Sequence, residues 1–111
     1  ADQRAGAAAG TWEMKSWWMR SHALMVEHGL RKDWLTEAVS TSGMRCRAGC
    51  RELFELLQRH RVPIMVFSAG LKDAISETLA QAGISESGVR IRANAPLFDQ
   101  SSNVIQAFAE P

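Results

Sequence analysis

Apolar residues recur with a helical period through the first part of the chain. In the first such stretch, residues 11–28, they stand at helical spacing before the stop signal Gly29; they are Met14, Trp17, Trp18, Leu24 and Met25. A second, shorter helix is predicted to run to about Ser40, with Asp33 as its N-cap. The pair Ser42-Gly43 then breaks the pattern, so two helices are expected before this break.

A third helix is predicted over residues 48–60, and its pattern is amphipathic. Apolar side chains occupy positions i, i+3, i+4 and i+7, while Arg and Glu fill the opposite face. The apolar set, which we expect to face inward, is Cys50, Leu53, Phe54 and Leu57. Pro63 prevents the helix from continuing.

The pattern then changes to short apolar runs that are typical of buried strands. Residues 62–67 form one such run, and residues 71–82 return to the helical period and end at Gly83. The inward side chains of that helix are predicted to be Ile75, Thr78, Leu79 and Ala82. The run VRIRA at residues 89–93 supplies a second strand. Because a helix intervenes, the two strands are expected to be parallel.

The end of the chain predicts a small hairpin, in which residues 97–98 and 104–108 flank the polar turn DQSSN. The whole reads as a helical portion followed by an α/β portion. We divide it into a linker or divergent end (1–10), a helical cap segment (11–44) and a partial α/β core (45–111). One strand pair with one helix cannot cover both faces of a sheet, so the rest of the sheet is expected to come from elsewhere.

Composition and charge exclude several classes of function. The 111 residues fit one domain, and a net charge of +1 gives no reason to expect binding to nucleic acid or acidic lipid. No apolar run approaches the length of a membrane span, and residues 1–10 lack the apolar core of a signal peptide. The cytosol is therefore the expected compartment, with Cys46 and Cys50 reduced. The chain begins without Met and stops just after a strand-like stretch, so truncation is expected.

The junction Ser68-Ala69-Gly70 has the composition of an anion site. It follows a buried strand and opens a helix, where a hydroxyl and unpaired amides favour a dianion, and Gly70 lets the backbone approach a ligand closely. The alternative is that Ser68 is an ordinary helix N-cap, since Ser is favoured there whatever the ligand. Phosphate chemistry is therefore the first hypothesis for this chain.

Three stretches together resemble a known family. The runs MKSWWMRSH (14–22), RAGCRELFELL (47–57) and VPIMVFSAGLKD (62–73) are similar to the cytosolic pyrimidine 5′-nucleotidases of the haloacid dehalogenase superfamily. The resemblance extends from about Met14 to Phe108. It implies an α/β fold, specifically a partial haloacid-dehalogenase-like Rossmannoid core with a helical cap segment.

The resemblance also implies an enzyme, a Mg²⁺-dependent phosphohydrolase that removes the 5′-phosphate from nucleoside monophosphates. Pyrimidine nucleotides are preferred in much of the family, and the reaction passes through an aspartyl-phosphate. The family's Asp-x-Asp motif lies upstream of these residues, and its lysine and metal ligands lie downstream of Pro111. No catalytic residue and no metal ligand is therefore expected in this chain, which should be inactive alone.

Substrate-binding positions of the family do match this sequence. Ser68, with the amides of Ala69 and Gly70, matches the loop that holds the phosphate oxygens, and Ser21 matches the cap serine that meets the substrate. The resemblance thus implies an adjacent wall for the base, formed by one of two neighbouring tryptophans, Trp17 and Trp18. This sequence departs from the family at Lys72, where Gly is usual and where Lys adds a charge that could face the phosphate. It also departs in the tail at residues 108–111.

The remaining polar residues have structural explanations beside functional ones. A capping or packing role is favoured for His22 over a contact with phosphate or ribose. Cys46 and Cys50 lack a histidine at zinc-site spacing. Asn94 is a minor candidate because it ends a strand, where functional residues gather. The alternative to an enzyme is a non-catalytic nucleotide- or phosphate-binding module that keeps only the anion loop.

Overall fold

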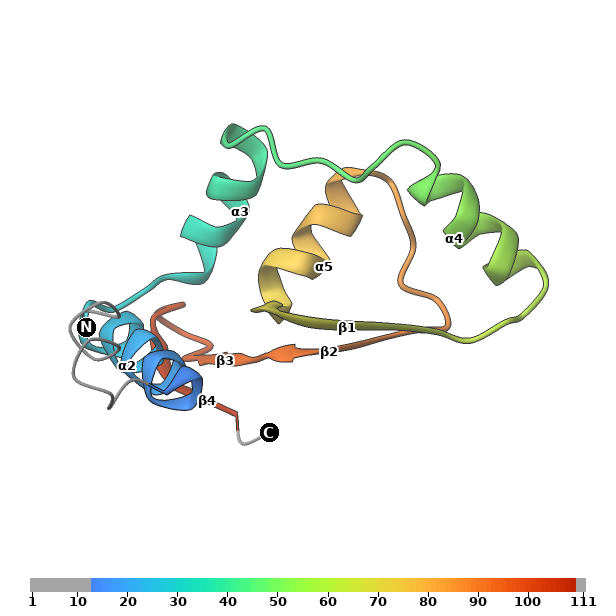
Figure 1. The fold of residues 1–111 in the computed structure, drawn as a ribbon. Coiled ribbons are helices and arrows are strands. Elements are labelled where there is room, and N and C mark those ends of the chain that lie inside the picture. Colours follow the sequence, from blue (N-terminus) through green and yellow to red (C-terminus); the bar gives the residue numbers. More distant parts are fainter. Residues whose placement is uncertain (1–12, 110–111) are drawn as a thin grey trace.

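Two parallel strands form the centre of the computed structural model, which describes residues 13–109 (Figure 1). β1 (Ile64–Leu71) leads into α5 (Lys72–Gln81), and β2 (Val89–Asn94) returns beside β1 in the same direction. The other elements are α2 (Met14–Glu27), α3 (Lys32–Thr41), α4 (Cys50–Arg59), β3 (Pro96–Phe98) and β4 (Ile105–Phe108). The predicted parallel strand pair and the predicted antiparallel hairpin of β3 and β4 are both confirmed.

The two faces of the parallel sheet have different environments. Half-buried apolar side chains share the face on which α5 packs: Ile64, Val66, Val89 and Ile91. Exposed side chains occupy the opposite face: Met65, Phe67, Arg90 and Arg92. On that face the Phe67 side chain is 86% exposed. A single helix therefore covers one face, and within residues 13–109 no element covers the other.

The best-buried apolar side chains lie around α5 and the hairpin. Val39 on α3 and Leu79 on α5 are buried where these two helices pack together, and Ile84 is buried just after α5. Gln81 Nε2 also donates a hydrogen bond to the Thr36 carbonyl at 3.3 Å across the same helix pair. Of the four side chains predicted to point inward from α5, Leu79 is the one that is buried; the other three are half-buried.

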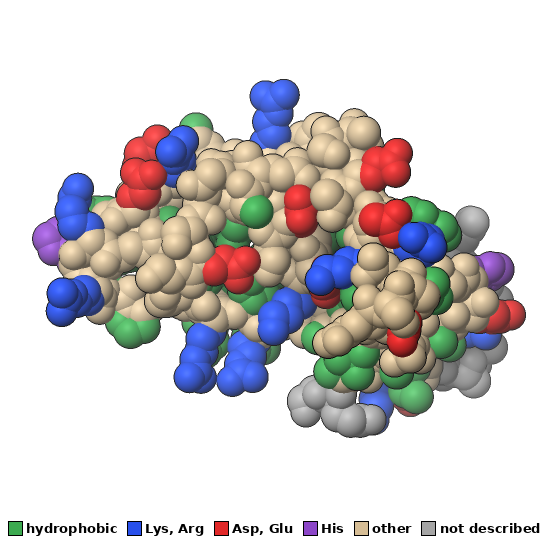
Figure 2. All heavy atoms as spheres, turned by 180° about the vertical axis from the view of Figure 1, so that it is seen from behind, with side chains coloured by type: hydrophobic (Ala, Val, Ile, Leu, Met, Phe, Trp, Pro, Cys, Tyr) green, Lys and Arg blue, Asp and Glu red, His purple; other side chains and the backbone are tan. Residues whose placement is uncertain are grey.

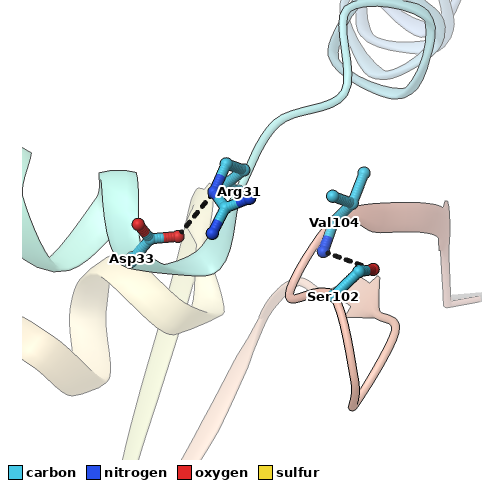
Figure 3. A network of polar contacts seen from close by, with 4 residues as sticks. All are labelled: Arg31, Asp33, Ser102 and Val104. Carbon is cyan, nitrogen blue, oxygen red and sulfur yellow. Dashed lines mark hydrogen bonds and ion pairs between the residues drawn. The ribbon is translucent and has the colours of Figure 1, made fainter.

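The segment between α2 and α3 is held by the hairpin far along the chain. The Ile105 amide donates to the Leu30 carbonyl at 2.8 Å, and the Lys32 amide donates to the Asn103 carbonyl at 2.9 Å. Arg31 forms an isolated antiparallel bridge with Val104 between them. Figure 3 shows Arg31 beside this hairpin. The helical portion and the α/β portion are thus joined by backbone pairing.

The hairpin turn is organised by one carboxylate. Asp99 Oδ2 accepts hydrogen bonds from the backbone and hydroxyl groups of Ser101 and Ser102, at 2.8 to 3.2 Å. The Ser102 amide, followed by the two hydroxyls, lowers the pKa of Asp99. Ser102 Oγ also accepts from the Val104 amide at 3.3 Å (Figure 3). Asp99 therefore shapes the turn that the sequence predicted here.

Three predicted boundaries were displaced. Arg31, and not Asp33, is the N-cap of α3, because the pairing of Arg31 with Val104 holds it extended. Asp33 lies in the first turn of α3 and accepts a hydrogen bond from Arg31 Nε at 3.0 Å (Figure 3).

The third helix begins at Cys50 because Gly49 is left-handed, with φ of 88°. β1 begins two residues late and continues to Leu71, since its end pairs with β2. The first helix is described from Met14 onward, so the predicted start at residue 11 lies outside the described residues.

α4 is amphipathic but its apolar face is largely uncovered. Leu53 is 53% exposed, so its predicted inward position is wrong, because no described element packs over it. The helix is tethered instead by Gln58, whose Nε2 donates to the carbonyls of Ser85 at 2.7 Å and Ser87 at 3.0 Å. No helix between residues 13 and 109 is long and apolar enough to cross a membrane.

α2 rests on β4 through an aromatic stack. The His22 imidazole lies 3.8 Å from the Phe108 ring, with 9° between their planes, and the Trp18 ring lies 6.1 Å away. His22 Nε2 is buried and has no hydrogen-bond partner among residues 13–109. Burial lowers the pKa of His22. These contacts agree with the packing role expected for this histidine.

Truncating a side chain in the α3–α5 contact should destabilise the chain far more than truncating one on α4. Leu79→Ala should lower the free energy of unfolding by about 2 to 5 kcal/mol, because Leu79 is 5% exposed and its loss leaves a cavity. Leu53→Ala is the matched control and should change it by less than about 1 kcal/mol. Urea unfolding followed by circular dichroism measures both. Equal losses would contradict the packing described above.

Acid should destabilise the contact between α2 and β4. The pKa of His22 in the folded chain lies below its ordinary value of 6.5, so the unfolded chain binds more protons in that range. The stability that the neutral His22 contributes to the folded chain is complete above pH 6.5 and is lost as the pH falls below that value. The urea midpoint should therefore drop on acidification, and drop less in His22→Phe, which keeps a stacking ring without titrating. The same drop in both chains would rule out His22 as the cause.

Candidate functional site

A cleft opens at the carboxyl ends of β1 and β2, where ligands commonly bind in parallel sheets. Its volume is about 430 Å³. The junction of β1 and α5 contributes Phe67, Ser68 and Lys72 to its lining, and β2 contributes Ile91, Arg92, Ala93 and Asn94. The sequence had placed its candidate phosphate loop at this same junction. Ser68 is the member of that loop that lines the cleft.

The Ser68 side chain is held by its own loop. Its Oγ accepts a hydrogen bond from the Gly70 amide at 3.0 Å. The expectation that the Gly70 amide is unpaired is therefore wrong, as is the alternative of Ser68 as helix N-cap, since Leu71 holds that position. A hydroxyl that accepts one hydrogen bond still has its proton to donate. The local bond thus fixes Ser68 Oγ and leaves a donor for an anion.

Gly70 is favoured here by a close approach to Ser68. A Cβ atom at this position would lie 3.3 Å from Ser68 Oγ, which is tighter than almost all real Cβ contacts. Its φ is not in the left-handed region, so backbone freedom is not the reason for glycine. The absence of a side chain therefore lets the amide reach the Ser68 hydroxyl.

Asn94 ties the end of β2 to the same loop. Its Nδ2 donates to the Ala69 carbonyl at 2.7 Å, and its backbone pairs with Leu71 after an irregularity in the ladder. Asn94 was only a minor candidate in the sequence. The structure makes it a residue that positions the loop and lines the cleft. Its place at the end of the second strand is the signal that made it a candidate in the sequence.

The charge in the cleft is positive. Lys72 and Arg92 both line it, and no acidic side chain is among the described residues of the lining. The sequence singled out Lys72 but not Arg92. Its position follows only from the register, which pairs Arg92 with Phe67, the residue before Ser68.

The other predicted substrate contacts lie on α2 and outside the lining of this cleft. Trp17 and Trp18 pack edge to face, with ring centroids 4.6 Å apart, and Trp18 continues into the stack on His22. Ser21 is half-buried on the same helix. The structure does not bring these three residues together with Ser68 in one cavity. Their contacts with a base or a substrate remain predictions.

The described residues do not form a metal site. Within residues 13–109 no group of three or more His, Cys, Asp and Glu side chains is placed to hold a metal ion. Cys46 and Cys50 are free thiols, as predicted, and burial followed by the neighbouring Cys50 raises the pKa of Cys46. No chemical step through a cation is therefore assigned to these residues.

Comparisons with known proteins agree with the resemblance seen in the sequence. Residues 8–111 match the family model described as pyrimidine 5′-nucleotidase (UMPH-1). The 7-methylguanosine phosphate-specific 5′-nucleotidase of Gallus gallus is 34% identical over 98 residues, which are 88% of this chain and 34% of that protein. The corresponding nucleotidase A of Xenopus laevis is 32% identical over 88 residues, which are 79% of this chain and 30% of that protein.

A solved structure is similar over the same extent. Cytosolic 5′-nucleotidase IIIB bound to cytidine superposes with a TM-score of 0.71 and 28% identity, covering 88% of this chain and 32% of that one. The predicted α/β fold, a partial haloacid-dehalogenase-like core, is confirmed. The chain spans about a third of the length of these relatives. Since the family model matches nearly the whole sequence, the chain belongs to the pyrimidine 5′-nucleotidase family.

Proposed function

We propose that this chain is part of a cytosolic 5′-nucleotidase that hydrolyses nucleoside 5′-monophosphates to nucleoside and phosphate. The family and the names of the relatives support nucleotide hydrolysis as the activity. The observation that carries the proposal is the Ser68 hydroxyl, which Gly70 holds beside a cleft lined by two cations. A hydroxyl donor and positive charge are the groups that a phosphate dianion requires.

In this proposal the chain's own residues bind and orient the phosphate. Ser68 donates to a phosphate oxygen, Gly70 fixes the hydroxyl, and Asn94 holds the loop through the Ala69 carbonyl. Ser21 contacts the substrate, and Trp17 or Trp18 provides an apolar wall beside the base. The division into a cap segment (11–44) and a core (45–111) belongs to the same proposal.

The catalytic groups of the proposed enzyme belong to residues outside the printed sequence. They comprise the aspartate nucleophile and the ligands of Mg²⁺, which when bound would neutralise charge on the phosphate. The 111 residues by themselves are therefore proposed to be inactive.

Pyrimidine nucleoside monophosphates are the proposed substrates. The family description names pyrimidine nucleotides, and the similar solved structure is bound to cytidine. A 7-methylguanosine monophosphate is the second candidate, because it is named for the relatives in Gallus gallus and Xenopus laevis. Comparing the hydrolysis of the two nucleotides distinguishes these candidates.

A different class of function is a binding module without turnover. The cleft offers a hydroxyl, an amide side chain and two cations, and its described lining has no carboxylate that could act as a nucleophile. Such a module would bind nucleoside monophosphates without releasing phosphate. Measuring binding and phosphate release on the same preparation separates it from the enzyme.

Replacing Ser68 should weaken the proposed reaction. In the protein that contains this chain, Ser68→Ala should lower kcat/KM for CMP by about 10- to 100-fold, since it removes a hydrogen bond to a charged group. Ser85→Ala is a matched control, because Ser85 Oγ accepts the Ser87 amide at 3.1 Å in the same local arrangement but away from the cleft. Phosphate release in the presence of Mg²⁺ measures both. Unchanged kinetics in Ser68→Ala would refute the assignment of the phosphate site.

A further inference from the structure

We propose that Lys72 and Arg92 bind the phosphate of the ligand together with Ser68, as a pair of cations that makes the cleft selective for dianions. This inference rests on the proposed function and adds two binding residues to it. Lys72 is the first residue of α5, and Arg92 lies on β2. Their side chains come from segments 20 residues apart and line the same cleft.

The fold places the two cations in the lining of the same cleft as the Ser68 hydroxyl. Arg92 is paired in register with Phe67, which immediately precedes Ser68. Lys72 follows the loop on its other side, where β1 ends and α5 begins. The same pairing places Asn94 on the Ala69 carbonyl and so fixes the loop between them. A phosphate at Ser68 would therefore lie in a cleft that is lined by one cation from β2 and one from the start of α5.

Neither cation is neutralised by a neighbour. The ion pairs among residues 13–109 are Arg31 with Asp33 and Arg51 with Glu55, so Lys72 and Arg92 have no carboxylate partner there. The cleft lining includes no acidic side chain within the described part of the chain. The start of α5 adds the positive end of a helix dipole. The site therefore carries positive charge that a bound anion would compensate.

The chemistry of the two side chains suits a phosphate dianion. A guanidinium can donate two parallel hydrogen bonds to phosphate oxygens, and an ammonium acts as a compact charge. A volume of about 430 Å³ leaves room for a nucleoside monophosphate. An uncharged nucleoside would gain nothing from either cation. Discrimination between a nucleotide and its nucleoside is thus the signature of this pair.

Arg90 supplies a matched control on the same strand. It lies on the same uncovered face as Arg92, paired with Met65, but it lines a separate hollow near Pro63 and Val89 at the other end of the strands. Figure 2 shows basic side chains projecting from the lower edge of the molecule, with apolar side chains exposed between them. If any positive charge on this face strengthened phosphate binding, replacing Arg90 would weaken that binding as much as replacing Arg92.

The test is calorimetric titration of the protein that contains this chain, without added Mg²⁺, with CMP, inorganic phosphate and cytidine at low ionic strength. Lys72→Gln and Arg92→Gln should each weaken the binding of CMP and phosphate by about five- to tenfold, and leave cytidine unchanged. Arg90→Gln should change them by less than about twofold. The losses should shrink in high salt, and CMP should bind more tightly as its phosphate gains its second charge near pH 6.

The outcomes separate this inference from the proposed function. Equal losses in Arg90→Gln and Arg92→Gln would show general electrostatics and overturn the pair. Full CMP affinity in Lys72→Gln and Arg92→Gln, with weaker binding in Ser68→Ala, would overturn the pair and leave the phosphate site standing. No binding of CMP or phosphate by the parent protein would overturn both. Melting curves confirm that every variant is folded, so a lost affinity reports on the site.

Discussion

The parallel pairing of β1 with β2 is the contact on which the candidate site depends. Parallel strands need a crossing connection, and α5 supplies it while burying one face of the pair. The register then decides which side chains meet at the carboxyl ends. It sets Arg92 opposite Phe67 and Asn94 opposite Leu71, so residues of both strands line the cleft together with Ser68. Without this pairing, the loop would lose the Asn94 bond that holds its Ala69 carbonyl.

The loop itself shows how a short sequence can prepare a donor for an anion. Gly70 gives its amide to Ser68 Oγ, which costs the loop one free amide but fixes the direction of the hydroxyl. Because the donor is already oriented, binding requires less ordering of the loop. The positive charge of Lys72 and Arg92 adds attraction that does not depend on fine geometry. Orientation and charge are therefore supplied by different residues of the same cleft.

The surfaces away from the cleft follow from how few elements flank the sheet. One helix buries one face of a two-stranded sheet, and the face that bears Met65 and Phe67 stays exposed within the described residues. The apolar face of α4 is in the same condition. By contrast, the hairpin gives the α2–α3 link a backbone partner, and His22 stacks on Phe108. Backbone pairing thus holds the described elements together, although few of their apolar side chains are buried.

The sequence by itself determined the elements, their order and the chemical character of the loop. Helical periods, the apolar run before Ser68 and the turn residues around Asp99 are local signals, because each depends on neighbours within a few positions. The sequence also carried the family resemblance. It could not predict that the N-cap of α3 is Arg31 and not Asp33, because Arg31 is held extended by pairing with Val104, some 70 residues away.

Only the tertiary structure decided which of these residues share a site. Arg92 and Asn94 entered the cleft through the register of a parallel ladder, which local pattern does not fix. The pairing of the Gly70 amide with Ser68 depended on atomic distances in the loop. Leu53 has the pattern of a core residue yet stays exposed, because burial depends on whether another element packs over it. Composition and spacing therefore predicted a phosphate loop, and the tertiary structure determined which residues line the cleft beside it.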